Sequence, residues 1–133
     1  MQKISRITIK ETTYEVKFPT VGQFLEIENI KMALTNGRYY DLLISNLKSS
    51  AFALRLTDAI AHFSVLIPDL KKDLNYKSYN DVDAYAAKTL IKVYEQQFLK
   101  WYQPLFEELV KQDDLEEEKG DEDDNGEEGS DLT

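Results

Sequence analysis

The strongest constraint on the fold of this chain is the charge of residues 113–133. These 21 residues hold twelve Asp or Glu and a single Lys, which gives them a net charge of −11. Because the whole chain carries −9, residues 1–112 carry −9 − (−11) = +2. The chain therefore consists of a nearly neutral segment rich in aromatic residues and a polyanionic segment, and the two must be considered separately.

The polyanionic segment contains only two large apolar residues, Leu115 and Leu132. Burying each of them would contribute roughly 2–3 kcal/mol, whereas ordering the backbone costs roughly 1–2 kcal/mol per residue. We therefore expect residues 113–133 to be disordered. Their like charges would keep copies of the protein apart in solution. Two other interpretations remain open: the segment attracts a basic partner, or it shields a binding face of its own chain.

The composition of residues 1–112 fits one domain with a core that needs no covalent staples. The chain has no Cys, which excludes disulfides, thiolate chemistry and cysteine-ligated zinc. Residues 1–10 lack the apolar region of a signal peptide. No apolar run approaches the ~20 residues of a membrane-spanning helix. We therefore expect an intracellular protein without a membrane partner.

Residues 3–18 have the pattern of a β-hairpin. Apolar and polar residues alternate with a period of two on both sides of the polar stretch Glu11–Thr13, which is typical of strands with one buried face. An isolated hairpin is only marginally stable in water. Its apolar face must therefore lie against the following helices or against another chain.

Four helices are predicted after the hairpin. Thr20 and Gln23 form a capping box that begins a helix over about residues 20–35, and Gly37 is suited to its left-handed end. Further helices are expected over 38–47, over 50–67 with Ser49 or Ser50 as its cap, and over 81–110 with Asn80 or Asp81 as its cap. Pro68 should end the third helix, and Pro104 should kink or split the fourth. The predicted fold class is α+β: an N-terminal hairpin packed on a mainly helical domain of about four helices, followed by the disordered acidic tail.

No catalytic or metal-binding constellation stands out in the sequence. His62 is the only histidine, and Asp58 precedes it by one helical turn, but a metal site needs three or four ligands. The carboxylate pairs Asp69/Asp73 and Asp81/Asp83 occupy positions typical of helix caps and loops. We predict a protein that is not an enzyme, with no catalytic residues, no metal and no cofactor.

Nucleic acid is not an expected partner. Residues 1–112 contain fifteen Lys or Arg, but these are scattered among thirteen Asp or Glu. A basic stripe, which nucleic-acid binding requires, is not apparent.

The aromatic residues say more about a binding partner than the basic residues do. Four of them crowd the end of the last predicted helix, just before the polyanionic segment, and two adjacent tyrosines begin the second helix. One interpretation is that they close the core. The other is that some form an exposed docking face for a protein partner. The candidate partner-binding residues are Tyr39, Tyr40, Phe98, Trp101, Tyr102 and Phe106.

The stretch from Ile7 to Glu28 resembles the opening of the tail assembly chaperones of tailed bacteriophages. The residues that match are Pro19-Thr20-Val21-Gly22 and Leu25-Glu26, at the junction of the hairpin and the first helix. The resemblance covers about twenty residues closely and the helical remainder only in kind.

The resemblance implies a non-enzymatic phage assembly protein of the host cell cytoplasm. Its partner would be the tape measure protein, whose hydrophobic helical segments it would hold soluble during tail assembly. The acidic tail departs from the family pattern. A structural or accessory virion protein, in the head or tail, is the alternative, using the hairpin and the aromatic helix face for assembly; an inhibitor of a basic host target is a third possibility. The sequence leaves open whether the protein stays in the virion and whether it forms a homo-oligomer.

Overall fold

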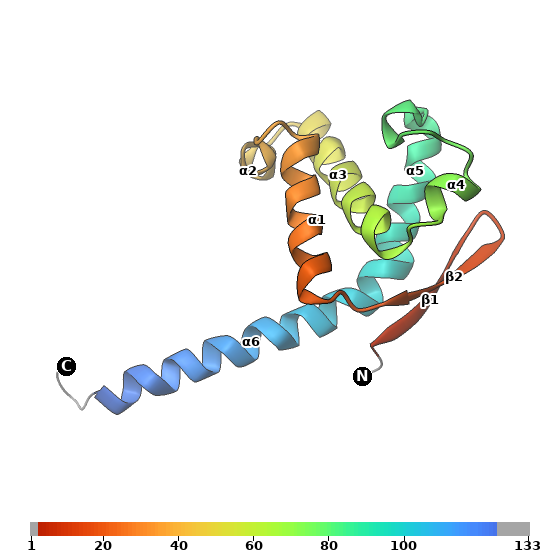
Figure 1. The fold of residues 1–133 in the computed structure, drawn as a ribbon. Helices are drawn as coiled ribbons and strands as arrows, with labels where there is room; N and C mark the ends of the chain where they lie inside the picture. Colours follow the sequence, from red (N-terminus) through yellow and green to blue (C-terminus); the bar gives the residue numbers. More distant parts are fainter. Residues whose placement is uncertain (1–2, 125–133) are drawn as a thin grey trace. The chain divides into compact units, whose positions relative to one another are not determined.

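The computed structural model describes the backbone of residues 3–124 and the side chains of residues 3–111. The chain divides into two compact units, Gln2–Leu99 and a C-terminal unit that begins at Lys100. Figure 1 shows an antiparallel two-stranded hairpin at the start of the chain, followed by helices. This arrangement confirms the predicted α+β class.

The hairpin consists of β1 (Ile4–Ile9) and β2 (Thr12–Lys17), with Ile9 opposite Thr12. Its loop is therefore Lys10-Glu11, and not the stretch Glu11–Thr13 that the sequence suggested. Both loop residues have a positive φ, 48° and 72°. This is the geometry of a type I′ turn, whose twist matches that of the flanking strands. The turn forms without the Asn or Gly that it normally favours.

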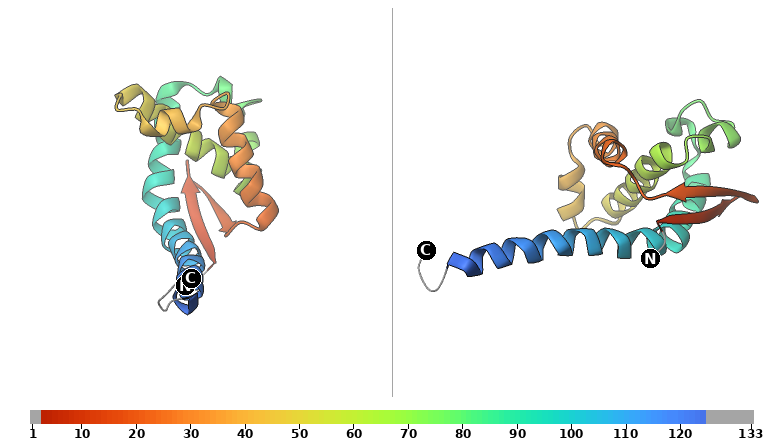
Figure 2. Two further views of the ribbon diagram at one scale, coloured as in Figure 1. Left: turned by 90° about the vertical axis from the view of Figure 1, so that its left-hand side faces the viewer. Right: turned by 60° about the horizontal axis from the view of Figure 1, so that its bottom comes forward.

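One face of the hairpin is buried, as its alternating pattern predicts. Ile7, Ile9 and Val16 are buried, whereas Ile4, of the opposite parity, is 45% exposed. β1 contacts α5 (Ala84–Val93), and the two views of Figure 2 show the hairpin beside the helices of the same unit. The prediction that its apolar face lies on the following helices is therefore confirmed.

Helix α1 (Val21–Leu34) has the predicted capping box at its start: the Thr20 hydroxyl accepts from the Gln23 amide, and the Gln23 side chain accepts from the Thr20 amide. At its end, Asn36 donates to the Ala33 carbonyl and Gly37 to the Met32 carbonyl. These two bonds make a Schellman motif in which Asn36 takes the first left-handed position, with φ 52°. Gly37 follows with φ 79° and so has the predicted left-handed conformation.

Helix α2 (Tyr39–Ile44) is short, and α3 (Lys48–Leu66) is the central helix of this unit. The predicted caps Ser49 and Ser50 lie inside α3, whose preceding residue Leu47 makes no side-chain cap. The helix ends before Pro68, as predicted. α3 packs against α1, α2 and α5. It contributes seven buried residues: Thr57, Ala59, Ile60, Ala61, His62, Phe63 and Leu66.

A short helix, α4 (Leu70–Asp73), and a 3₁₀ turn, η1 (Tyr79–Asp81), connect α3 to α5. The cap of α5 is Asp83, and neither Asn80 nor Asp81 as predicted. Its carboxylate accepts from the amides of Tyr85 (3.0 Å) and Ala86 (3.2 Å). Asn80 and Asp81 belong to the 3₁₀ turn η1, so α5 begins only at Ala84.

The long helix predicted over 81–110 is divided, but not at Pro104. A π-helical turn, η2 (Tyr94–Phe98), follows α5, and in it the Leu99 amide donates to the Tyr94 carbonyl, five residues earlier. Helix α6 (Leu99–Asp124) then continues through Pro104. Proline removes a single amide donor, and hydrogen bonds on both sides of it keep α6 continuous.

The structure describes only part of the segment that we expected to be disordered, residues 113–133. The backbone is helical as far as Asp124. The side chains from residue 112 onward, and residues 125–133 entirely, lie outside the described residues, so that expectation stays a prediction there. Within the described part, no helix is both long and apolar enough to cross a bilayer.

Candidate protein-binding surface

The two predicted tyrosines of α2 have different environments. Their rings meet edge to face at 5.5 Å, so they point in different directions. The Tyr39 hydroxyl donates to Asp58 Oδ1 at 2.6 Å, and its ring is half-buried. Tyr40 is 58% exposed. Only Tyr40 therefore offers most of its surface to a partner.

Phe98 belongs to the core. It is 0% exposed and stacks on Tyr94 at 5.3 Å, while Phe63 meets both rings edge to face at 5.9 Å. Such aromatic pairs contribute about 0.5–1.5 kcal/mol beyond the burial of their area. The expectation that Phe98 belongs to an exposed docking face is therefore corrected, because a fully buried ring offers no surface.

The three remaining predicted residues lie on α6, in the C-terminal unit. Tyr102 is buried, whereas Trp101 and Phe106 are half-buried. The Tyr102 ring stacks with Phe106 at 5.9 Å and lies 6.4 Å from Trp101. Within this set, the accessible surface is limited to parts of Trp101 and Phe106.

Most of the exposed apolar surface lies on residues that sequence reasoning did not select. Helix α2 has no buried residue, although five of its six residues are apolar or aromatic. We define the α2 patch as the four residues on it, or just after it, that are large, apolar and exposed. They are Tyr40, Leu43, Ile44 and Leu47.

Helix α1 adds a second strip of exposed apolar residues. Val21, Leu25 and Met32 are exposed, and their spacing of four and then seven residues puts them on one face of the helix. The opposite side packs on α3 through the buried Ile27. The apolar residues of α1 therefore occupy both of its sides, a distribution that is typical of a helix covered on more than one side.

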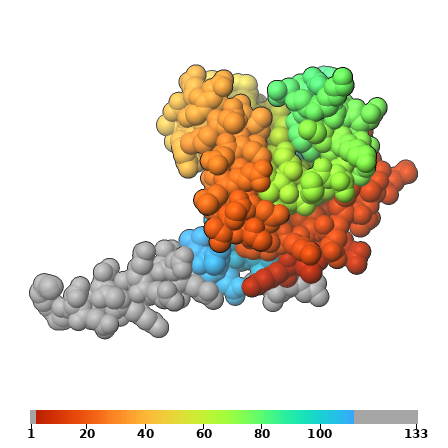
Figure 3. Space-filling view, in the orientation of Figure 1, coloured from red at the N-terminus to blue at the C-terminus, as the bar shows by residue number. Residues whose placement is uncertain are grey.

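A groove about 280 Å³ in volume opens on the same unit. Its floor is α3, one wall is the end of α1 at Leu34, and the other wall is formed by η1 and α5. Figure 3 shows the hollow between the orange α1 side and the green side of η1 and α5. Apart from the side chains of Thr57, Tyr79 and Asn80, its lining is apolar: Leu34, Ala53, Leu56, Ile60, Val82, Ala84, Ala87 and Leu90.

A half-buried polar cluster holds α2 in place. Lys31 Nζ lies 2.9 Å from Glu28 and 4.0 Å from Asp58, and it stands 5.3 Å from the centre of the Tyr39 ring. Burial raises the pKa of Asp58, and burial and the hydrogen bond to Asp58 raise the pKa of Tyr39. These contacts connect α1, α2 and α3, so the cluster stabilises the helices that carry the α2 patch.

His62 does not form a catalytic pair with Asp58. Its Nδ1 lies 2.7 Å from the backbone carbonyl of Asp58, while the Asp58 carboxylate binds Tyr39. The imidazole is buried beside Tyr94 and Phe98, at 5.4 and 5.3 Å. Burial lowers the pKa of His62 to about 4. At neutral pH it is an uncharged core residue.

One member of each predicted carboxylate pair makes a structural contact. Asp83 caps α5, and Asp73 accepts a hydrogen bond of 2.8 Å from the Tyr14 hydroxyl, which connects α4 to the hairpin. Together with burial, that bond raises the pKa of Tyr14 to about 12. Among the described residues, no group of three or more His, Asp or Glu is placed to hold a metal ion. The arrangement suits noncovalent binding of apolar side chains.

Comparison of the chain with protein-family models, with curated proteins and with solved structures finds no match.

Proposed function

We propose that the chain is a non-enzymatic assembly protein of a tailed bacteriophage, a tail assembly chaperone that binds apolar helical segments of the tape measure protein. The observation that carries the proposal is the apolar groove together with the exposed apolar residues of α1 and α2. A groove of this kind accepts the apolar face of an amphipathic helix. The resemblance of residues 7–28 to this chaperone family supports the choice of partner.

Exposed apolar residues gather on two neighbouring elements, α1 and α2. Large apolar patches on a folded protein mark interaction sites or a risk of aggregation. The 21 residues from 113 to 133, with their net charge of −11, would counter that risk by repulsion between copies. A chaperone that exposes apolar surface and stays soluble needs both properties.

Co-expression with an aggregation-prone apolar fragment of a tape measure protein tests the proposal. The fragment should stay soluble with the wild-type chain and precipitate with an Ile44→Asp/Leu47→Asp variant, because two carboxylates would then occupy the α2 patch. Ile44 is 80% exposed, so the change should leave the fold intact. Phe98→Ala is unsuitable as a binding variant, because it would open a cavity in the core.

Tyr85→Asp is the matched control. Tyr85 is 82% exposed on α5 and does not line the groove, so this variant should keep the fragment soluble. A wild-type chain that leaves the fragment insoluble, or an α2-patch variant that protects it as well as the control does, would refute the proposal.

A structural or accessory virion protein is the second candidate function. The hairpin favours it, since the outer edge of β2 is open to pairing with another strand. Mass spectrometry of purified particles separates the two candidates. A virion component is present in a fixed number of copies per particle, whereas an assembly chaperone is absent from the finished particle.

A further inference from the structure

Every second residue of β2 has backbone groups that point away from β1 and are not paired within the hairpin. In a two-residue hairpin the pair next to the loop, Ile9 and Thr12, is hydrogen-bonded, and bonded and non-bonded pairs then alternate. The bond of 2.8 Å from the Phe18 amide to the Lys3 carbonyl follows this alternation. The amides and carbonyls of Thr13, Glu15 and Lys17 therefore point away from β1.

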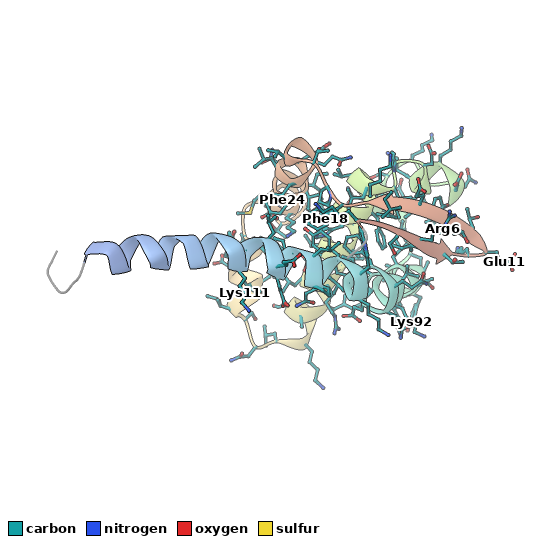
Figure 4. The ribbon with its side chains drawn as sticks, turned by 90° about the horizontal axis from the view of Figure 1, so that it is seen from below. Arg6, Glu11, Phe18, Phe24, Lys92 and Lys111 are labelled. Carbon is teal, nitrogen blue, oxygen red and sulfur yellow. The ribbon has the colours of Figure 1, made fainter. Side chains whose placement is uncertain are left out.

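The two edges of the hairpin differ in how they are covered. On the β1 edge, Gln97 accepts from the Thr8 amide at 2.9 Å and donates to the Thr8 carbonyl at 3.1 Å, as a neighbouring strand would. On the β2 edge, Thr13, Glu15 and Lys17 are exposed, and their outward backbone groups have no hydrogen-bond partner among the described residues. Figure 4 shows Arg6 on β1 and Glu11 at the far tip of the hairpin, with the strands between them uncovered by any helix in this view.

We propose that the β2 edge binds β2 of a second copy of this chain, antiparallel, about a two-fold axis through Val16. In this register Glu15 lies opposite Lys17 of the second copy, and Lys17 opposite its Glu15. Each of these pairs joins outward-facing residues, so each exchanges two backbone hydrogen bonds. Oppositely charged side chains directly across two strands attract each other.

The charges select this register over its neighbours. Moving the axis by one residue, to Glu15, places Glu15 opposite Glu15 of the second copy, and moving it to Lys17 places the two lysines opposite each other. Like charges across a strand pair are destabilising. Intermediate shifts place outward groups opposite inward groups and form no ladder. Opposite charges two residues apart on an edge strand therefore complement an antiparallel second copy.

The inner face of the hairpin fits the same register. Tyr14 would lie opposite Phe18 of the second copy, once on each side of the axis. Val16, on the axis, is 0% exposed in the single chain and adds no apolar surface to the contact. Tyr14 and Phe18 are half-buried in the single chain, so both have apolar surface left to cover. The two hairpins would together form a four-stranded antiparallel sheet.

Sedimentation equilibrium of the full chain tests the proposal. At micromolar concentration the wild-type protein should have twice the 15.4 kDa mass of the chain. Glu15→Lys and Lys17→Glu should each be monomeric, because each places like charges in both cross-strand pairs. An equimolar mixture of these two variants should form a heterodimer, since the opposite pairs are then restored. Lys92→Glu, an exposed reversal on α5, should stay dimeric.

A monomeric wild-type chain would overturn the proposal, and would leave the edge to a strand of some other protein. So would a Glu15→Lys variant that dimerises as strongly as the wild type, or folded single variants that fail to associate when mixed. Circular dichroism of each variant establishes that it is folded.

Cysteine pairing gives a second measurement that does not depend on charge reversal, since the chain has no Cys of its own. A mixture of Glu15→Cys and Lys17→Cys chains should form a disulfide on oxidation, because hydrogen-bonded partners have Cα atoms about 5.5 Å apart. Each variant alone should crosslink poorly, because its two cysteines would be diagonal and about 7–8 Å apart or more. Equal crosslinking in all three samples, or none in the mixture, would contradict the proposed register.

Discussion

At the scale of single residues, Lys10 and Glu11 hold the least favourable backbone geometry described in the chain. Both have a positive φ, which costs an ordinary side chain roughly 1–2 kcal/mol. The other described residues with a positive φ are asparagines or glycine, for which this conformation is common. The hairpin keeps the strained turn because its register buries Ile7, Ile9 and Val16.

We predict that Glu11→Gly stabilises the protein by about 0.5–1 kcal/mol, since glycine adopts a positive φ without steric cost, although it adds entropy to the unfolded chain. Urea unfolding measures the change. Glu26→Gly, an exposed helical position of α1, is the control and should instead destabilise the protein by about 1 kcal/mol. Loss of stability in Glu11→Gly would show that the turn is not strained.

His62 should make stability depend on pH. Its pKa is lowered by burial to about 4 in the folded chain, from 6.5. Between these values the unfolded chain binds more protons, so stability falls as pH falls from 6.5 towards 4. The charged groups that face His62 act through space: Lys31 lowers its pKa further and Glu28 raises it. Asp58, whose pKa is raised, has the opposite dependence, since its contribution falls as pH rises.

The free energy of unfolding of the wild-type protein should therefore drop by about 2 kcal/mol more than that of His62→Gln between pH 7 and pH 5. Glutamine stays uncharged over this range, and comparing the two proteins removes the contribution of Asp58. Urea titrations at both pH values measure the difference. Equal losses in the free energy of unfolding of the two proteins between pH 7 and pH 5 would mean that His62 is protonated in the folded state.

At the scale of elements, the π turn η2 carries a side chain that connects β1 of the hairpin to the helices. Gln97 satisfies both backbone groups of Thr8, a residue 89 positions away in sequence. A helix cannot continue the ladder of a strand through its own backbone, so a carboxamide, which can donate and accept at the same time, takes that role.

Gln97→Ala should cost about 1 kcal/mol, because the Thr8 amide and carbonyl are exposed enough for water to replace the lost partner. Hydrogen–deuterium exchange should become faster in β1 and stay unchanged in α3. The adjacent Gln96 is exposed, and Gln96→Ala is the control of identical chemistry. If the amides of β1 exchange at the same rate in both variants, the Gln97 contact contributes nothing to the position of the hairpin.

Short-range sequence signals account for most element boundaries. The capping box of Thr20 and Gln23, the left-handed Gly37 and the stop at Pro68 depend on residues within a few positions of one another, and each is found as predicted. The predicted starts of α3 and α5 were wrong for a different reason. At Asp83 and at Leu47, several residues could begin a helix, and the packing of the connecting segments selected the one that did.

At the scale of the whole molecule, the acidic segment should affect solubility more than stability. Deleting residues 113–133 should leave the melting temperature within a few degrees of that of the full chain, because the segment has only two large apolar residues to bury. Its loss should lower the concentration at which the protein precipitates, since the remaining chain has a net charge of only +2.

Differential scanning calorimetry and a precipitation series measure both quantities. A variant in which all acidic residues of the segment are replaced by Asn or Gln is the control, and it should be as insoluble as the truncated chain. A large fall in melting temperature on truncation would show that the segment packs on the rest of the protein.

The sequence by itself determined the hairpin, most of the helices and the separation of a polyanionic segment, because periodicity, capping and charge are properties of neighbouring residues. It could not determine which apolar residues remain accessible. Phe98 and Ile44 are both large and apolar on helices, yet Phe98 is fully buried and Ile44 is 80% exposed. Only the tertiary structure decided this, since burial depends on segments distant in sequence, such as His62 and Phe63 of α3 beside Phe98. The groove and the open edge of β2 arise in the same way.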